Sequence, residues 1–172
     1  MDQPQNNSAR HASTNSRCCS MMFSTTCAYA MRAMCRLAAL RQQGYASMHE
    51  ICEGTDLPSQ FIAKIMRDLT KADLLISAKG RGGGFALARD PASICLYDIV
   101  EVIDGVQQYT NCVLGLSTCD DKQPCPQHDD VKPVRRQILN YLKTTTLDLM
   151  SQALIDKQQI IQQAQRGKIA DV

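Results

Sequence analysis

The residues with the clearest capacity for chemistry are cysteines, of which this 172-residue chain has nine. Three of them lie in the segment CVLGLSTCDDKQPCPQH, which spans residues 112–128 and ends in a histidine. The spacing C-x6-C-x5-C-x2-H brings three thiols and one imidazole into a short loop shaped by glycine and proline. The four candidate metal ligands are Cys112, Cys119, Cys125 and His128.

These side chains favour a soft metal centre, because thiolates select zinc and iron–sulfur clusters. In structural zinc sites neighbouring cysteines are usually separated by only about two to four residues. The gaps of six and five residues in this segment suit a loop folded around a larger object. The pattern therefore predicts a two-iron or four-iron cluster, with zinc as the alternative occupant and unliganded thiols as a third interpretation.

Most of the other cysteines fit structural or incidental roles. Cys35 and Cys52 fall on predicted helices beside apolar stripes, where cysteine behaves as a small hydrophobic residue. Cys27 lies near the start of the first predicted helix, and it remains a second candidate ligand. The odd number of thiols and the polar, signal-free residues 1–20 indicate the reducing cytoplasm rather than a set of disulfides.

Three predicted helices come before the cysteine segment. Helical spacing of apolar residues runs over 25–42, and a short helix follows over 48–53. Ser47 and Glu50 have the spacing of a capping box at the start of that short helix. A third helix opens after a tight turn at Pro58, so the second and third helices are consistent with a helix-turn-helix.

A β-hairpin is predicted directly after the third helix. Residues 74–78 and 85–88 have the character of two strands, and KGRGGG over 79–84 is the turn between them. A helix-turn-helix followed by a basic hairpin is the winged-helix arrangement. The predicted fold class is therefore mainly α with a β-hairpin wing, and a helical domain with a merely solvated basic face is the alternative.

The winged-helix interpretation assigns specific side chains to DNA. The start of the third helix would enter the major groove, where a glutamine can read adenine and a serine can bond a base or a phosphate. Lysine and arginine at the glycine-rich hairpin tip can approach a groove closely. The predicted DNA-binding residues are Ser59, Gln60, Phe61, Lys64, Lys79 and Arg81.

The net charge of only +2 conceals an uneven distribution. Residues 1–96 carry 11 Lys and Arg against 7 Asp and Glu, and residues 131–172 carry 7 against 3. Residues 97–130 between them carry 1 against 7. Two basic regions therefore flank an acidic segment, and the small total does not argue against nucleic acid as a partner.

Several classes of protein are disfavoured by composition. No apolar run approaches the roughly 20 residues of a membrane span, so no membrane partner is predicted. Aromatic residues make up only 5% of the chain, which argues against an RNA-binding sheet that stacks bases on aromatic rings. No nucleophile–base pair, paired carboxylates or cofactor fingerprint points to an enzyme or to a small-molecule substrate.

The patterns divide the chain into five parts. They predict a disordered N-terminal extension over 1–20, a winged helix-turn-helix domain over 21–104 and a cysteine-rich cluster-binding loop over 105–130. Two dimerisation helices follow over 131–156, the first of them long and covering about 132–144, and a polar tail occupies 157–172. Thr145 and Asp148 have the spacing of a cap at the start of the second of these helices.

Taken together, these motifs resemble the Rrf2 family of bacterial winged-helix regulators. The resemblance covers about residues 21–152 and is carried by FSTTCAYAMRAMCRLA, the helix pair, the wing KGRGGGFALARDP, the helix YDIVEVIDG, the loop ending CPQH and the late TLDLM. The spacing of six residues after Cys112 departs from the five found in one branch of the family, and the twenty-residue N-terminal extension is not typical of it.

The resemblance implies a homodimer in which the helix 132–144 crosses its mate and two winged helices bind a palindromic operator. It also implies an iron–sulfur cluster on Cys112, Cys119 and Cys125. The fourth ligand in one branch is a histidine matched here by His128, and in another an acidic residue matched by Ala28, which cannot coordinate a metal.

The functional prediction is a cytoplasmic transcriptional regulator that binds double-stranded DNA as a homodimer and senses redox state, nitric oxide or iron status through an iron–sulfur cluster. The alternative is a zinc-stabilised or cluster-free scaffold or adaptor protein that binds no operator. Metal content and operator binding distinguish the two hypotheses.

Overall fold

The computed structural model describes residues 22–41, 44–117 and 120–170, with no side-chain description for 158 and 161–170. The predicted N-terminal extension over 1–20 lies outside this range, as does Cys119. The elements in chain order are α1 (Thr25–Leu40), α2 (Met48–Cys52), α3 (Ser59–Lys71), β1 (Leu75–Ala78), β2 (Gly84–Leu87), the 3-10 turn η2 (Pro91–Ser93), α4 (Leu96–Ile103), the 3-10 turn η3 (Gln107–Tyr109), α5 (His128–Thr144) and α6 (Leu147–Ala170).

Local hydrogen bonds explain where the first helices begin. The Ser24 hydroxyl accepts from the Cys27 amide at 3.0 Å and caps α1. At α2 the Ser47 amide donates to the Glu50 carboxylate at 2.8 Å, while the Glu50 amide donates back to the Ser47 hydroxyl. The predicted capping box is therefore confirmed.

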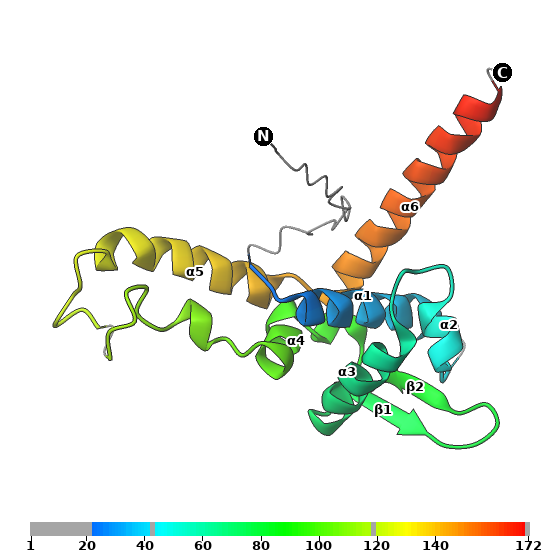
Figure 1. Cartoon of the computed structure of the whole chain (residues 1–172), viewed down its shortest axis with the longest axis horizontal. Coiled ribbons are helices and arrows are strands. Elements are labelled where there is room, and N and C mark those ends of the chain that lie inside the picture. Colours follow the sequence, from blue (N-terminus) through cyan, green and yellow to red (C-terminus); the bar gives the residue numbers. More distant parts are fainter. Residues whose placement is uncertain (1–21, 42–43, 118–119, 171–172) are drawn as a thin grey trace, which may run out of the picture.

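The core lies between α1 and the helices around it. In Figure 1, α1 crosses the middle of the molecule, with α3 and the hairpin below it and α6 leaving above it. Side chains from α1, α3 and α4 meet there, and the largest of them, such as Met34, Met66 and Ile99, are fully buried. The predicted fold class, mainly α with a β-hairpin wing, is confirmed.

The wing is joined to the body by a contact that the sequence did not reveal. β1 and β2 pair antiparallel, and Phe85 of β2 also exchanges two backbone hydrogen bonds with Ala46, at 2.8 and 2.9 Å. Gly84 sits where this third segment crosses, and a Cβ added to it would lie 2.1 Å from the Ala46 carbonyl oxygen. The angle of the wing therefore depends on the absence of a side chain at Gly84.

We expect Gly84→Ala to lower the free energy of unfolding by about 3 kcal/mol, because it combines a backbone clash with a positive φ of 148°. The matched control is Gly82→Ala, which has a positive φ but open space around it and should cost about 1 to 2 kcal/mol. Urea denaturation followed by circular dichroism measures both. Equal losses for the two variants would contradict this role of the Ala46 contact.

Two helices complete the chain. α5 begins at His128, four residues before the predicted start, and α6 continues through Ala170, well beyond residue 156 where the predicted dimerisation helices end. The first part of α6 packs on α1, and the rest projects away from the body (Figure 1). In the described part of the chain, no helix combines the length and apolar character needed to cross a bilayer.

Candidate DNA-binding face and cysteine-rich loop

The third helix presents its predicted DNA readers to solvent. Ser59, Gln60 and Lys64 are exposed at its first two turns, while its opposite side is buried in the core. Phe61 is also exposed, at 40%, but it differs from the other three in having a packing partner. Its ring makes an edge-on contact with Tyr29 of α1, with ring centroids 5.9 Å apart. Phe61 therefore also holds α3 against α1.

The turn that precedes α3 is fixed by side chains that sequence reasoning did not single out. Arg32 of α1 forms an ion pair with Asp56, and the guanidinium holds the pKa of that carboxyl below its usual range. The Thr55 hydroxyl donates to the Cys52 carbonyl at 2.7 Å and accepts from the Leu57 amide at 3.3 Å. These contacts set the direction in which α3 leaves the turn.

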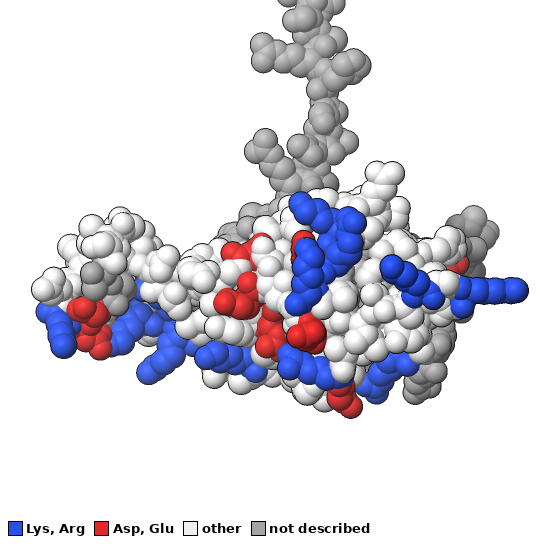
Figure 2. Space-filling view, turned by 90° about the horizontal axis from the view of Figure 1, so that it is seen from below, with Lys and Arg blue, Asp and Glu red and all other residues white. Residues whose placement is uncertain are grey.

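The wing tip carries the other predicted readers. Lys79 and Arg81 are exposed and separated by Gly80, which has a positive φ of 91°. Figure 2 shows the molecule from below, the side on which Figure 1 draws α3 and the hairpin. Lys and Arg side chains are spread across this face, with a smaller group of Asp and Glu near its middle. Such a distribution suits a surface that follows a phosphate backbone.

Two of the three predicted cluster thiols lie side by side. The Sγ atoms of Cys112 and Cys125 are 3.8 Å apart, although thirteen positions separate them in the sequence. Backbone amides of Leu114 and Leu116 bond the Cys112 sulfur and lower its pKa. A thiolate stabilised in this way is the form of cysteine that coordinates metals. The donor chemistry of the loop therefore fits a soft metal or an iron–sulfur cluster.

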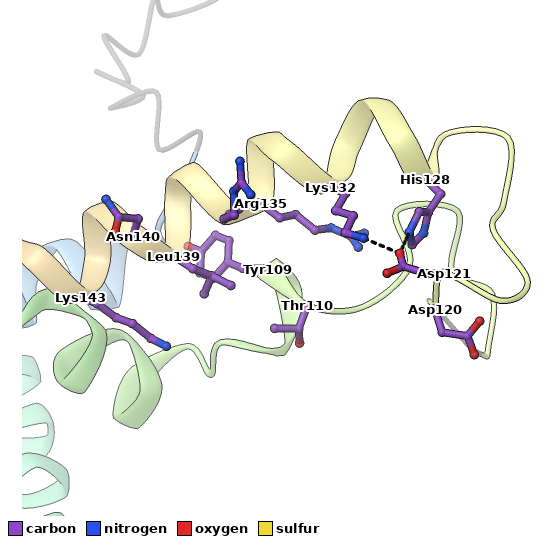
Figure 3. Close-up of a pocket in the computed structure, with 11 residues that line it drawn as sticks. Tyr109, Thr110, Asp120, Asp121, His128, Lys132, Arg135, Leu139, Asn140 and Lys143 are labelled. Atoms are coloured by element: carbon purple, nitrogen blue, oxygen red, sulfur yellow. Dashed lines mark hydrogen bonds and ion pairs between the residues drawn. The ribbon is translucent and has the colours of Figure 1, made fainter.

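His128, the predicted fourth ligand, begins α5 and is only 7% exposed. Its Nε2 lies 2.8 Å from Oδ1 of Asp121, and Nζ of Lys132 lies 2.5 Å from the same oxygen (Figure 3). Lys132 first, and then His128, lower the pKa of Asp121. A bond from Nε2 of His128 to a metal would therefore displace Asp121, a partner that sequence reasoning missed.

Within the described ranges, which omit Cys119, no three His, Cys, Asp or Glu side chains are gathered closely enough to hold a metal ion. Cys27 does not extend the ligand set. Its side chain is fully buried, and burial, followed by the nearby charge of Asp104, raises its pKa to about 12. Cys27 is a neutral core thiol, which argues against its role as a second candidate ligand.

A groove of about 660 Å³ runs between α5 and the segment that enters the loop. Figure 3 shows Lys132, Arg135 and Lys143 of α5 along it, with Tyr109 and Thr110 on the other side. Arg135 donates to the backbone carbonyl of Asn111, so the start of the loop is attached to α5.

Further bonds connect this region to the winged helix. The Tyr109 hydroxyl donates to the Met22 carbonyl, just before α1. At the junction of α5 and α6, the Leu96 amide donates to the Thr145 carbonyl at 2.9 Å. The Leu147 amide donates to the Ile94 carbonyl at 2.8 Å. Hydrogen bonds therefore connect the loop and α5 to the elements that position α3.

Comparison with known proteins agrees with this architecture. The chain is 34% identical over 129 residues to a protein of Aquifex aeolicus named as an HTH-type transcriptional regulator, covering 74% of this chain and 89% of that protein. It is 25% identical over 138 residues to the HTH-type transcriptional regulator IscR of Xenorhabdus nematophila, covering 80% and 81%. These relatives are transcriptional regulators and not enzymes.

Solved structures share the fold. The structure of T. potens IscR superposes with a TM-score of 0.62 at 28% identity, covering 77% of this chain and 88% of that one. CymR, the global cysteine regulator of B. subtilis, has a TM-score of 0.63 at 23% identity, covering 77% and 98%, and it supports the fold alone. The Rrf2 family model, described as an iron-dependent transcriptional regulator, matches residues 23–153. The chain therefore belongs to the Rrf2 family of DNA-binding, winged-helix transcriptional regulators.

Proposed function

We propose that this regulator is a cytoplasmic homodimer that binds a palindromic operator and whose DNA affinity depends on an iron–sulfur cluster. The observation that carries the proposal is the pair of Cys112 and Cys125 thiols, 3.8 Å apart in a loop between the winged helix and α5. Iron appears in the description of the matching family model, which supports iron over zinc as the metal.

The proposed ligands are Cys112, Cys119, Cys125 and His128. A bound cluster would supply a centre that is destroyed by oxygen or nitric oxide and lost when iron is scarce. The chain's own residues would link the presence of the cluster to the position of α5 and of the winged helix. With the loop fastened at Cys112 and Cys125, Asn111 stays on Arg135 and Tyr109 stays on Met22 at the start of α1.

Operator binding would then respond through a shift between two states of the dimer. When the loop is ordered, α5 is held against the body and the two α3 helices keep one spacing. When the loop is released, that spacing is no longer fixed and DNA affinity changes. The proposed readers are Ser59, Gln60 and Phe61 at the start of α3, with Lys64, Lys79 and Arg81 on the surrounding phosphates and grooves.

Anaerobic purification of the full chain tests the cluster. We expect a coloured protein with iron and acid-labile sulfide, whose visible absorption disappears on exposure to air or nitric oxide. Operator affinity, measured by gel shift on the promoter of the chain's own gene, should change in parallel. A colourless protein with one zinc per chain and no operator binding would instead support the zinc-stabilised scaffold.

Asp121→Asn is expected to weaken retention of the metal by about 10- to 100-fold, because the carboxylate orients His128 and such supporting partners tune metal ligands. The measurement is iron remaining after a timed challenge with a chelator. Asp129→Asn is the control, since Asp129 is an exposed carboxylate in the first turn of α5. If both variants keep iron equally well, Asp121 does not support the ligand set.

The proposed dimer uses the outer face of α5. Val134 and Tyr141 lie seven residues apart on one side of this helix and are 53% and 47% exposed. We expect the double variant Val134→Asp, Tyr141→Asp to sediment as a monomer, because burying two carboxylates in an apolar interface is costly. Asn140→Asp, on another face of α5, should stay dimeric. A double variant that sediments like the native chain would place the interface elsewhere.

A further inference from the structure

The close pair of Cys112 and Cys125 has a chemistry that does not need a metal. We propose that in the metal-free chain these two thiols are a redox modification site, which two-electron oxidants such as hydrogen peroxide convert to an intramolecular disulfide. Their sulfur atoms, 3.8 Å apart, are already in van der Waals contact. A disulfide needs a sulfur–sulfur distance of about 2.05 Å, so the two side chains must approach by less than 2 Å.

The backbone on both sides of the pair is held in place. Each cysteine begins a turn closed by a hydrogen bond, from the Gly115 amide to the Cys112 carbonyl and from the His128 amide to the Cys125 carbonyl, both at 2.9 Å. Gly115, which closes the first turn, has a positive φ of 71°, a conformation that glycine adopts without strain. Closing the disulfide therefore calls for rotation of two side chains rather than for rearrangement of the chain.

Both ends of the pair are also attached to α5. The Asn111 carbonyl, next to Cys112, accepts a hydrogen bond from Arg135, and the Cys125 carbonyl accepts one from the amide of His128, the first residue of the same helix. The disulfide would thus join two points that α5 already keeps together. It would hold the loop closed after the metal is lost, in a form that a thiol reductant reopens.

The difference in exposure between the two thiols gives the order of the steps. Cys125 is half-buried and Cys112 only 7% exposed, so peroxide reaches Cys125 first. The Cys125 thiol attacks one peroxide oxygen, the O–O bond breaks, the thiol proton passes to the departing oxygen, and a sulfenic acid and one water form. The Cys112 sulfur then attacks the Cys125 sulfur, the S–S bond forms, the S–O bond breaks and a second water leaves. Two electrons pass from the two thiols to one peroxide.

The buried thiols of the core do not compete with this pair. Cys27 and Cys35 are enclosed among apolar side chains, and burial raises the pKa of each to about 12. Cys52 is half-buried, and its sulfur contacts the Met48 sulfur at 4.0 Å. Cys119 shares the loop and lies outside the described residues, so the experiment must distinguish it from the pair.

The test uses the full chain, fully reduced and freed of metal with a chelator, and then treated with one equivalent of hydrogen peroxide. Free thiols are blocked, and the protein is digested with trypsin and chymotrypsin, which separate Cys112 from Cys119 at Leu114 and Leu116. Mass spectrometry is expected to find Cys112 joined to Cys125 in most oxidised molecules. A thiol reductant should restore both thiols.

Three variants make the result specific. Cys119→Ser should form the disulfide as the native chain does, while Cys112→Ser and Cys125→Ser should not form it. Circular dichroism confirms that each variant is folded. A bond that uses Cys119 instead, or a folded Cys119→Ser chain that forms no bond, would overturn the proposal. Because the chain is metal-free throughout, a failure of the iron–sulfur proposal leaves this experiment unaffected, and the reverse also holds.

Discussion

Replacing Arg81 at the wing tip with alanine is expected to weaken operator binding by about 1 to 3 kcal/mol, or roughly 5- to 150-fold. Arg81 is exposed on a hairpin whose glycines let the backbone approach a groove closely, and a guanidinium there gains from the narrow, negative minor groove. Lys64→Ala should act differently. It should reduce the magnitude of the slope of log affinity against log salt concentration by about 1, because a lysine that binds a phosphate releases a counterion.

Fluorescence anisotropy over a series of salt concentrations measures both effects on the same promoter fragment. Lys157→Ala is the matched control, because it removes an equal charge from an exposed position on α6, far along the chain from the proposed readers. Its affinity and salt dependence should stay close to those of the native chain. If Arg81→Ala and Lys64→Ala bind as tightly as the native chain, the DNA-binding face must be built from other residues.

Replacing Cys125 with serine is expected to remove the cluster altogether, so that iron, acid-labile sulfide and visible absorption all fall to background. The neutral hydroxyl of serine is a hard, weak ligand that does not replace a thiolate toward iron. Operator affinity of the anaerobic protein should then match that of native chain from which the metal has been removed.

The control for this change is Cys52→Ser, which alters a half-buried thiol whose sulfur contacts Met48 rather than the loop. It should keep its iron. Unfolding curves for both variants separate loss of metal from loss of the fold. A folded Cys125→Ser chain that retains full iron content would exclude Cys125 from the proposed ligands.

Features that depend on neighbours in sequence were predictable. The Ser47–Glu50 capping box needs only two side chains three residues apart, and the hairpin needs only two short strands around a glycine-rich turn. The limits of these elements agree with the structure to within about one residue, as is common for element ends. The exposure of Ser59, Gln60 and Lys64 follows in the same way from the helical period of the buried residues between them.

Predictions were less accurate where one local signal competed with another. The helix predicted over about 132–144 begins earlier, at His128, where the His128 amide donates to the Cys125 carbonyl and the acidic Asp129 and Asp130 suit a helix N-terminus. The cap of α6 falls one residue later than predicted, because the Thr146 hydroxyl accepts from the Leu149 amide at 3.4 Å while Thr145 ends α5.

By itself, then, the sequence determined the winged-helix class and the thiols and basic side chains that could do chemistry, because propensity, period and spacing are local. Only the tertiary structure decided the contacts that bring distant residues together. In the fold, Ala46 pairs with Phe85 beside Gly84, and His128 contacts Asp121. The fold also buries Cys27 and places Cys112 beside Cys125. Such contacts form between residues that the folded backbone brings together, and the cysteine spacing indicated only that Cys112 and Cys125 share one loop.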